Sequence, residues 1–152
     1  MLKFNHGRFE LEQLSFTIPD NLYLTSVGEM QIENGFELFT EDNKIHMVVA
    51  GNDVAENARE SIESIFDEED NFKRMSEIVE IERAGLDGFS VTYEDSKAYH
   101  WEACLNTPDF SECPTITVWG RTEKKEGEQG VIRMVALCKG ILDSIRVSAQ
   151  VW

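Results

Sequence analysis

The sequence predicts a single α+β domain, residues 1–152, in which two main helices pack on a largely antiparallel sheet. The order of the elements supports this class, because strands come first and are followed by a helix, a run of strands, a second helix and a terminal strand. A length of 152 residues is usual for one domain and long enough to bury a substantial core. The hydrophobic content of 41% agrees with a chain that folds along its whole length.

The first third of the chain is expected to form short strands. Residues 1–9 predict a short strand or arm, and residues 14–18 alternate apolar and hydroxyl side chains until Pro19 stops the strand. The apolar segment 22–30 has no period and is expected to be irregular. Two β-rich runs within residues 35–50 are separated by three polar residues and predict a hairpin.

The first helix is expected to begin in the segment Gly51-Asn52-Asp53. Asp53 and Glu56 have the spacing of a capping box, and carboxylates are favourable at the positive end of a helix. A narrow apolar stripe follows at helical spacing and consists of Val54, Ala58, Ile62, Ile65 and Phe66. The acidic run 67–71 is expected to end this helix in solvent.

Alternation and turn residues predict a three-stranded meander between residues 78 and 105. An antiparallel sheet commonly has one covered face and one polar face, and the meander is expected to follow this rule. The apolar face is expected to hold Val79, Ile81, Phe89, Val91, Tyr93, Tyr99, Trp101 and Ala103. The polar face is expected to hold Glu80, Glu82, Ser90, Thr92, His100, Glu102 and Cys104.

The last third of the chain predicts a fourth strand at 115–122 and a helix that continues into a terminal strand. The helical stripe consists of Val131, Met134, Val135, Cys138, Ile141, Leu142 and Ile145. From Ile145 to Val151 the apolar residues alternate instead, which is the period of a strand. A competing interpretation makes 131–137 a strand paired with 115–122, and the spacing that continues to Ile145 favours the helix.

The chain is strongly acidic, with 29 acidic and 14 basic residues and a net charge of −15. This charge argues against binding to nucleic acid or to anionic membrane surfaces, because both depend on Lys and Arg. Two interpretations stay open: the charge serves solubility alone, or it serves a basic protein partner.

A cytoplasmic location is expected if Met1 is the natural start, because the N-terminus lacks the apolar core of a signal peptide. If Met1 is not the natural start, an N-terminal leader peptide that has been removed stays an open alternative. Cys138 lies on the helical stripe and is expected in the core. Cys104 and Cys113 flank a proline-containing loop and are expected to be free thiols in the cytosol or bridged in an exported protein.

Three reactive side chains alternate along one predicted strand. They are His100, Glu102 and Cys104, whose side chains project from the same side of the strand with about 7 Å between one and the next. Such a set suggests either a nucleophile with its base or three metal ligands. Residues two apart on a strand diverge too far for a tight nucleophile–base hydrogen bond, and no second cluster completes a zinc set. A mixed polar sheet face is therefore favoured, with no catalytic residue, no metal site and no cofactor expected.

Trp119 is the more informative candidate. By alternation with Ile116 and Val118 it lies opposite the core, beside Thr117 and Arg121. An exposed Trp next to an Arg suits a protein-binding hot spot, while packing under a loop is the alternative. The candidate binding residues are Trp119, Arg121, His100 and Glu102.

Three segments together resemble the PsbP-like fold. They are SFTIPDNLYLTS (15–26), AGLDGFSVTYED (84–95) and GILDSIRV (140–147), which are similar to its strand-then-proline opening, its glycine-turn hairpin and its closing helix-to-strand. A photosystem subunit, a Ran-binding nuclear transport factor and many small bacterial proteins share this fold. The resemblance implies an α-β-α sandwich and a binding or accessory role, and no metal-binding or Ran-binding motif of these proteins matches the chain.

The first functional hypothesis is therefore a non-enzymatic, acidic protein-binding or accessory module with a protein partner. A more specific form of this hypothesis makes that partner a basic protein. The second is an acidic immunity protein or a secretion-chaperone-like protein that neutralises a basic partner. The third is a hydrolase or metal enzyme that uses the sheet face around His100 and Cys104.

Overall fold

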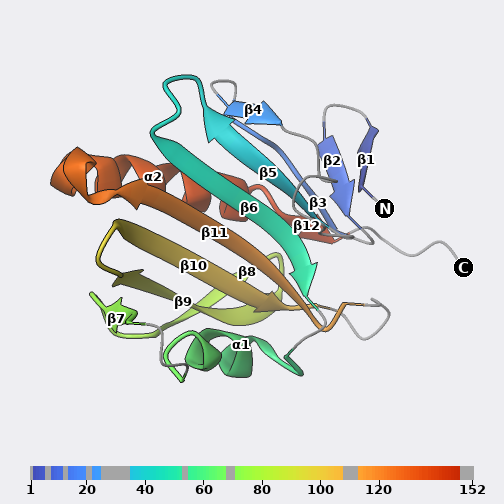
Figure 1. Cartoon of the computed structure of the whole chain (residues 1–152). Helices are drawn as coiled ribbons and strands as arrows, with labels where there is room; N and C mark the ends of the chain where they lie inside the picture. Colours follow the sequence, from blue (N-terminus) through green and yellow to red (C-terminus); the bar gives the residue numbers. More distant parts are fainter. Residues whose placement is uncertain are drawn as a thin grey trace, which may run out of the picture.

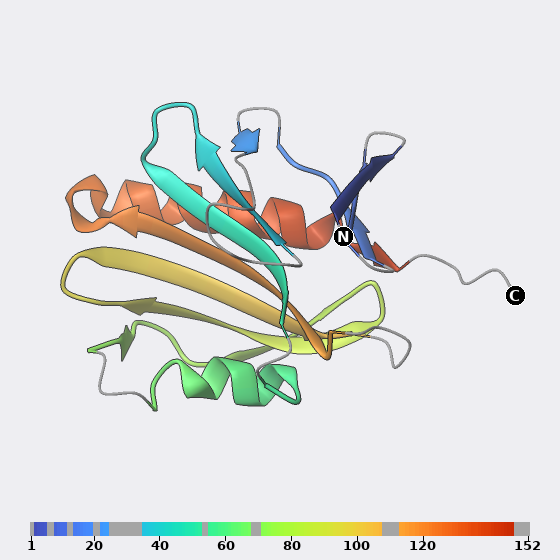
Figure 2. The same ribbon diagram turned by 45° about the vertical axis from the view of Figure 1, so that its right-hand side comes forward.

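The computed structural model describes residues 2–5, 8–11, 14–19, 22–24, 35–52, 55–67, 71–107 and 113–147. An eight-stranded antiparallel sheet carries helix α1 on one face and helix α2 on the other (Figures 1 and 2). Its strands are β4 (Leu22–Leu24), β5 (Gly35–Thr40), β6 (Ile45–Asn52), β7 (Lys73–Arg74), β8 (Val79–Arg83), β9 (Leu86–Glu94), β10 (Ala98–Asn106) and β11 (Thr115–Glu123). The helices are α1 (Ala58–Ser64), the 3-10 turn η2 (Lys124–Glu126) and α2 (Gly127–Asp143). The predicted α+β class with two main helices on an antiparallel sheet is confirmed.

The strand order of the main sheet is β4-β5-β6-β11-β10-β9-β7, and β8 also pairs with β9. A smaller sheet joins the two ends of the described chain in the order β1-β2-β3-β12. Its strands are β1 (Leu2–Asn5), β2 (Arg8–Leu11), β3 (Leu14–Phe16) and β12 (Arg146–Val147). The predicted terminal strand is confirmed for 146–147, while residues 148–152 lie outside the described part. Residues 22–24 pair with β5, so the expectation of irregular structure there is wrong.

Helix α2 covers the sheet with the apolar stripe that the sequence predicted. Met134, Cys138, Ile141 and Leu142 are buried against the sheet, and the alternative strand at 131–137 is excluded. Gly120 on β11 allows the close approach, because a Cβ atom there would lie 2.5 Å from Cys138 Sγ. Burial raises the pKa of Cys138 to about 12, as expected for a core thiol.

Helix α1 begins later than predicted, at Ala58, because β6 continues to Asn52 as a partner of β11. Asn57 is the N-cap, and its side-chain oxygen accepts a hydrogen bond from the Glu60 amide at 2.9 Å. Glu60 Oε2 in turn accepts from the Glu56 amide at 3.2 Å. The capping spacing therefore belongs to Asn57 and Glu60, and Asp53 lies outside the described residues.

The two faces of the meander differ from the prediction. Tyr93 pairs with His100 and Val91 pairs with Glu102, and directly opposite residues project from the same side of a sheet. Phe89, Val91 and Tyr93 therefore face α1, while Trp101 and Ala103 face α2 together with Val79 and Ile81. The expectation of one apolar and one polar face is wrong, because a helix packs on each side of this sheet.

Among the described residues, no helix is both long enough and apolar enough to span a membrane. Cys104 is a free, buried thiol, so it is not bridged to Cys113.

Candidate functional site

The four candidate binding residues lie next to one another on the side of the sheet that faces α1. Arg121 of β11 pairs directly with His100 of β10, and Trp119 pairs with Glu102. Arg121 also pairs with His46 of β6 on its other side. His46 therefore lies in the same part of the sheet as the four candidates, because β11 inserts between β6 and β10.

A continuous row of rings crosses this side of the sheet from β5 to β9. The Phe39 ring stacks on His46 at 4.5 Å, and the His46 ring meets the edge of Trp119 at 5.2 Å. Trp119 lies 5.7 Å from His100, which stacks on Tyr93 at 4.8 Å. We call these five residues the ring row. The predicted binding residues included Trp119 and His100 of this row but not Phe39, His46 or Tyr93, because the row depends on the register of five strands.

Both histidines of the ring row are neutral near neutral pH. Burial lowers the pKa of His46 and of His100, and the nearby Arg121 guanidinium lowers both further. Each has a carboxylate partner that opposes the shift: His46 Nε2 lies 3.6 Å from Glu37 Oε2, and His100 Nε2 lies 3.2 Å from Asp95 Oδ2. Within the described part of the chain, His46 Nε2 and His100 Nδ1 have no hydrogen-bond partner.

Glu102 is a half-buried carboxyl group between Tyr93 and Trp119 on the same side of the sheet. Burial raises its pKa to about 7, although a hydrogen bond from Tyr93 opposes the rise. The Tyr93 hydroxyl donates to Glu102 Oε1 at 3.0 Å. Burial, followed by the Glu102 charge, raises the pKa of Tyr93 far above its ordinary value, so the phenol stays protonated as the donor.

Cys104 shares this side of the sheet with His100 and Glu102, as predicted, but it is covered by α1 and fully buried. Burial raises the pKa of its thiol above the ordinary value, and Thr117 Oγ1 lies 3.6 Å from the sulfur. A thiolate nucleophile requires the opposite environment. Over the described ranges, no group of three or more His, Cys, Asp or Glu side chains is arranged to hold a metal ion.

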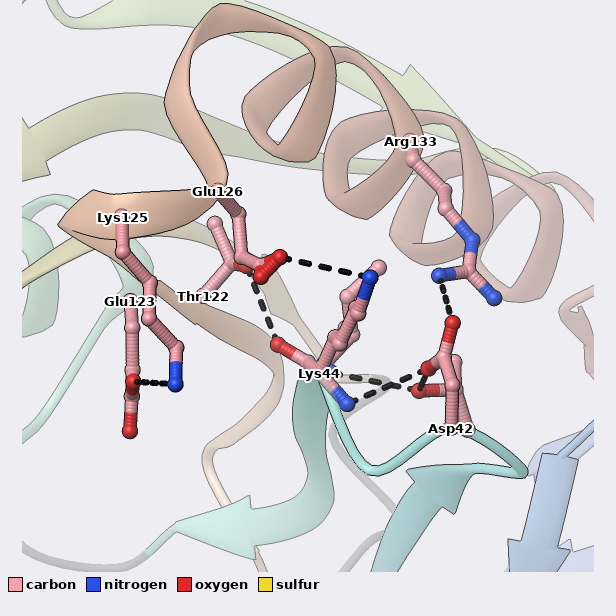
Figure 3. A network of polar contacts seen from close by, with 9 residues as sticks. Asp42, Lys44, Thr122, Glu123, Lys125, Glu126 and Arg133 are labelled. Atoms are coloured by element: carbon pink, nitrogen blue, oxygen red, sulfur yellow. Dashed lines mark hydrogen bonds and ion pairs between the residues drawn. The ribbon is translucent and has the colours of Figure 1, made fainter.

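A pocket of about 320 Å³ opens at the β5–β6 end of the ring row. Its lining includes Phe39, Lys44, His46, Arg121, Lys125 and Glu126. Several of its lining residues belong to the polar network of Figure 3, in which three cations are each paired with a carboxylate. These pairs are Arg133 with Asp42 at 2.7 Å, Lys44 with Glu126 at 3.5 Å and Lys125 with Glu123 at 3.2 Å.

Arg121 differs from the other cations around this pocket, because no ion pair is described for it within residues 35–52 and 113–147. Its side chain is partly exposed, as is that of the neighbouring Trp119, which packs on the α1-side cluster. Asp42 is already paired with Arg133, and hydrogen bonds from Thr40 and Arg133 lower the pKa of Asp42 to about 2. The pocket therefore combines the rings of Phe39 and His46 with the guanidinium of Arg121, for which no ion pair is described in these ranges.

No protein-family model matches the chain, and no curated protein matches it. Among solved structures it is similar to LpqN of Mycobacterium tuberculosis, a protein involved in cell envelope biogenesis, with 8% identity and a TM-score of 0.54. That match covers 90% of this chain and 83% of LpqN. A protein from Bacteroides thetaiotaomicron is also similar, with 10% identity and a TM-score of 0.49 over 91% of this chain. The chain spans 46% of that protein's length. The similarity to LpqN shows a shared fold.

Proposed function

We propose that this protein is a non-enzymatic binding module that holds a protein partner on the surface around Trp119 and Arg121. The observation that carries the proposal is the pairing of a partly exposed Trp and an uncommitted Arg beside the pocket of about 320 Å³. Trp and Arg are the residue types most enriched among the energetically dominant contacts of protein interfaces. Trp119 is held in the ring row between His46 and His100, and Arg121 lies between the same two histidines in the strand register.

The chemistry of the pocket indicates which part of a partner enters it. Arg121 provides a planar guanidinium for a carboxylate of the partner, which is the strongest hydrogen-bonding match for this group. The faces of Phe39 and Trp119 suit an adjacent apolar or aromatic side chain. Lys44 and Lys125 form the rim, where their existing carboxylate partners limit their contribution.

Affinity capture from an extract of the source organism tests this proposal, with the wild type and three variants as bait. Arg121→Gln and Trp119→Ala are expected to reduce capture of the partner by about tenfold or more, which is typical of hot-spot truncations. Lys97→Gln is the matched control, because it removes an exposed cation from the β9–β10 turn. Unchanged capture by Arg121→Gln and Trp119→Ala would show that the partner binds elsewhere.

The second candidate is an acidic immunity protein or a secretion-chaperone-like protein that neutralises a basic partner. The net charge of −15 supports it, since a field of this sign accelerates association with cationic proteins. Capture at low and high salt separates the two candidates. A basic partner is expected to be lost at high salt, and binding that is insensitive to salt would contradict this candidate.

Catalysis at His100 and Cys104 has the weakest support, because the thiol is buried with a raised pKa. We also propose that the fold is PsbP-like, supported by one helix on each face of the sheet and by α2 leading into the closing strand β12. A cytoplasmic location is part of the proposal and is supported by the free thiols of Cys104 and Cys138.

A further inference from the structure

Strand β8 forms an open edge of the main sheet. It pairs with β9, and no other described strand pairs with it. Ala84 and Gly85 have positive φ angles of 55° and 79° and form the two-residue turn between β8 and β9. Arg83 and Leu86 are then the first hydrogen-bonded pair, and the alternation of an antiparallel ladder directs the backbone N–H and C=O of Glu80 and Glu82 outward.

The surface is hollowed on both sides of this edge. On the α1 side lies an open pocket of about 1000 Å³, whose lining includes Glu77, Glu80 and Phe89. On the α2 side lies a pocket of about 270 Å³, whose lining includes Val79, Ile81, Trp101, Val135 and Leu142. Since the side chains of a strand alternate between the two sides of a sheet, a strand added at β8 would direct its side chains into both pockets in turn.

The two pockets have different chemistry. Glu80 and Glu82 project from the α1 side and are exposed, and no ion pair is described for either within residues 71–107. The cations on that side are already engaged: Arg59 pairs with Glu63 at 2.8 Å, and Arg74 lies over the Phe66 ring at 5.9 Å.

The α2-side pocket is mainly apolar, with Arg83 and Lys139 as the cations of its lining, and the edge exposes 51% of Val79 beside it. The cation at the end of β8, Arg83, forms an ion pair with Asp143. A strand that fits both pockets therefore carries basic side chains toward Glu80 and Glu82 and apolar side chains toward Val79 and Ile81.

We propose that the β8 edge binds an extended segment of a protein partner, in which basic and apolar residues alternate, by addition of that segment as a further strand of the sheet. Main-chain hydrogen bonds to Glu80 and Glu82 provide the pairing, and the two pockets provide the selectivity. The proposal rests on the second candidate above, a basic partner, and is independent of the surface around Trp119.

A second copy of the chain fits this edge poorly. In an antiparallel self-pairing centred on Ile81, Glu80 of one copy faces Glu82 of the other. Like charges directly opposite each other destabilise a strand pair. The acidic edge thus discourages self-association while it favours a cationic strand.

The test uses a synthetic peptide of about nine residues, blocked at both ends, in which lysine and valine alternate. Binding is measured by calorimetry at low and high salt, and amide hydrogen exchange is followed by NMR. The Glu80 and Glu82 amides are expected to exchange at least about tenfold more slowly when the peptide is bound, because they become hydrogen-bonded. A peptide of the same composition with its lysines and valines in two blocks is the control and is expected to bind at least about tenfold more weakly.

Two variants at one position separate charge from backbone pairing. Glu80→Gln removes one carboxylate and is expected to weaken binding a few-fold, with a smaller salt dependence. Glu80→Pro also removes the outward N–H, which an edge strand tolerates, and is expected to abolish amide protection at Glu82. Glu128→Gln is the matched control, because it removes a carboxylate on α2 instead of one on the β8 edge. This variant is expected to change the affinity for the peptide no more than marginally.

Three results would overturn the proposal: no binding of the alternating peptide, binding without protection of Glu80 and Glu82, or wild-type affinity in Glu80→Pro. Salt-dependent binding without that protection would leave the basic-partner candidate standing and would refute the edge site alone.

Discussion

Glu102 links the electrostatics of the ring row to the stability of the whole domain. Its side chain is half-buried on the α1 side of the sheet, and its carboxyl group accepts a hydrogen bond from the Tyr93 hydroxyl at 3.0 Å. Burial raises its pKa from 4.5 to about 7, so the folded protein prefers the protonated form more strongly than the unfolded chain does. We predict that Glu102→Gln, which keeps an acceptor for Tyr93 and removes the charge, stabilises the protein above neutral pH.

The sign and the size follow from proton linkage. Below pH 4.5 the carboxyl is protonated in both states, so its titration does not affect folding. Between pH 4.5 and about 7 only the unfolded chain releases the proton, so stability falls as the pH rises through this window. Above about pH 7, the titration of Glu102 has lowered the free energy of unfolding of the wild type by on the order of 3 kcal/mol, because each pH unit between the two pKa values corresponds to about 1.4 kcal/mol.

Urea denaturation of the wild type and Glu102→Gln at a series of pH values between 5 and 8 measures this difference. The gap between the two free energies of unfolding is expected to widen with pH and to level off above about 7. Tyr93→Phe is a useful companion variant, because loss of its hydrogen bond raises the pKa of Glu102 further. A gap that stays constant over the whole range would show that Glu102 is solvated, and the reasoning about its burial would be wrong.

Three further predictions concern the packing of the two helices. Gly120→Ala places a Cβ atom 2.5 Å from Cys138 Sγ, so we expect a loss of about 1–3 kcal/mol in urea denaturation. Adding Cys138→Ala should recover part of that loss, and simple additivity of the two changes would contradict the steric explanation. Asn57→Ala removes the acceptor for the Glu60 amide and should cost about 1 kcal/mol, while Asn57→Ser should keep most of the stability. Cys104 and Cys138 are buried with raised pKa values, so both should resist a thiol reagent until the protein unfolds, and rapid labelling of either in the native state would contradict their placement.

The two faces of the meander show what a local sequence pattern can predict and what it cannot. Alternation predicted correctly which residues of one strand share a side, for example His100, Glu102 and Cys104. It did not establish which residues of neighbouring strands share a side, because a shift of one residue in register exchanges the two faces. A signal was present in the turn, since the two-residue turn Ser96-Lys97 places Asp95 opposite Ala98 and so pairs odd-numbered with even-numbered positions.

The candidate site was predicted in part for the same reason. Trp119 and Arg121 lie on one side of β11, as alternation predicted, and their partners on β10 are the two other predicted binding residues, His100 and Glu102. The missed neighbours of this site come from elsewhere in the chain. His46 and Phe39 reach Arg121 because β6 pairs with β11 and β5 pairs with β6.

The sequence by itself determined the α+β class, the long strands β9, β10 and β11 with their alternation, and the apolar stripe of α2 that leads into a terminal strand. These features are local, because hydrophobic periodicity and turn residues act within one element or between adjacent ones. Only the tertiary structure decided which residues of neighbouring strands share a face, that β11 brings His46 beside Arg121, and that β8 is left as an edge between two pockets. Each of these depends on strand order and register, which arise from contacts between segments far apart in the chain and leave no periodic pattern in the sequence.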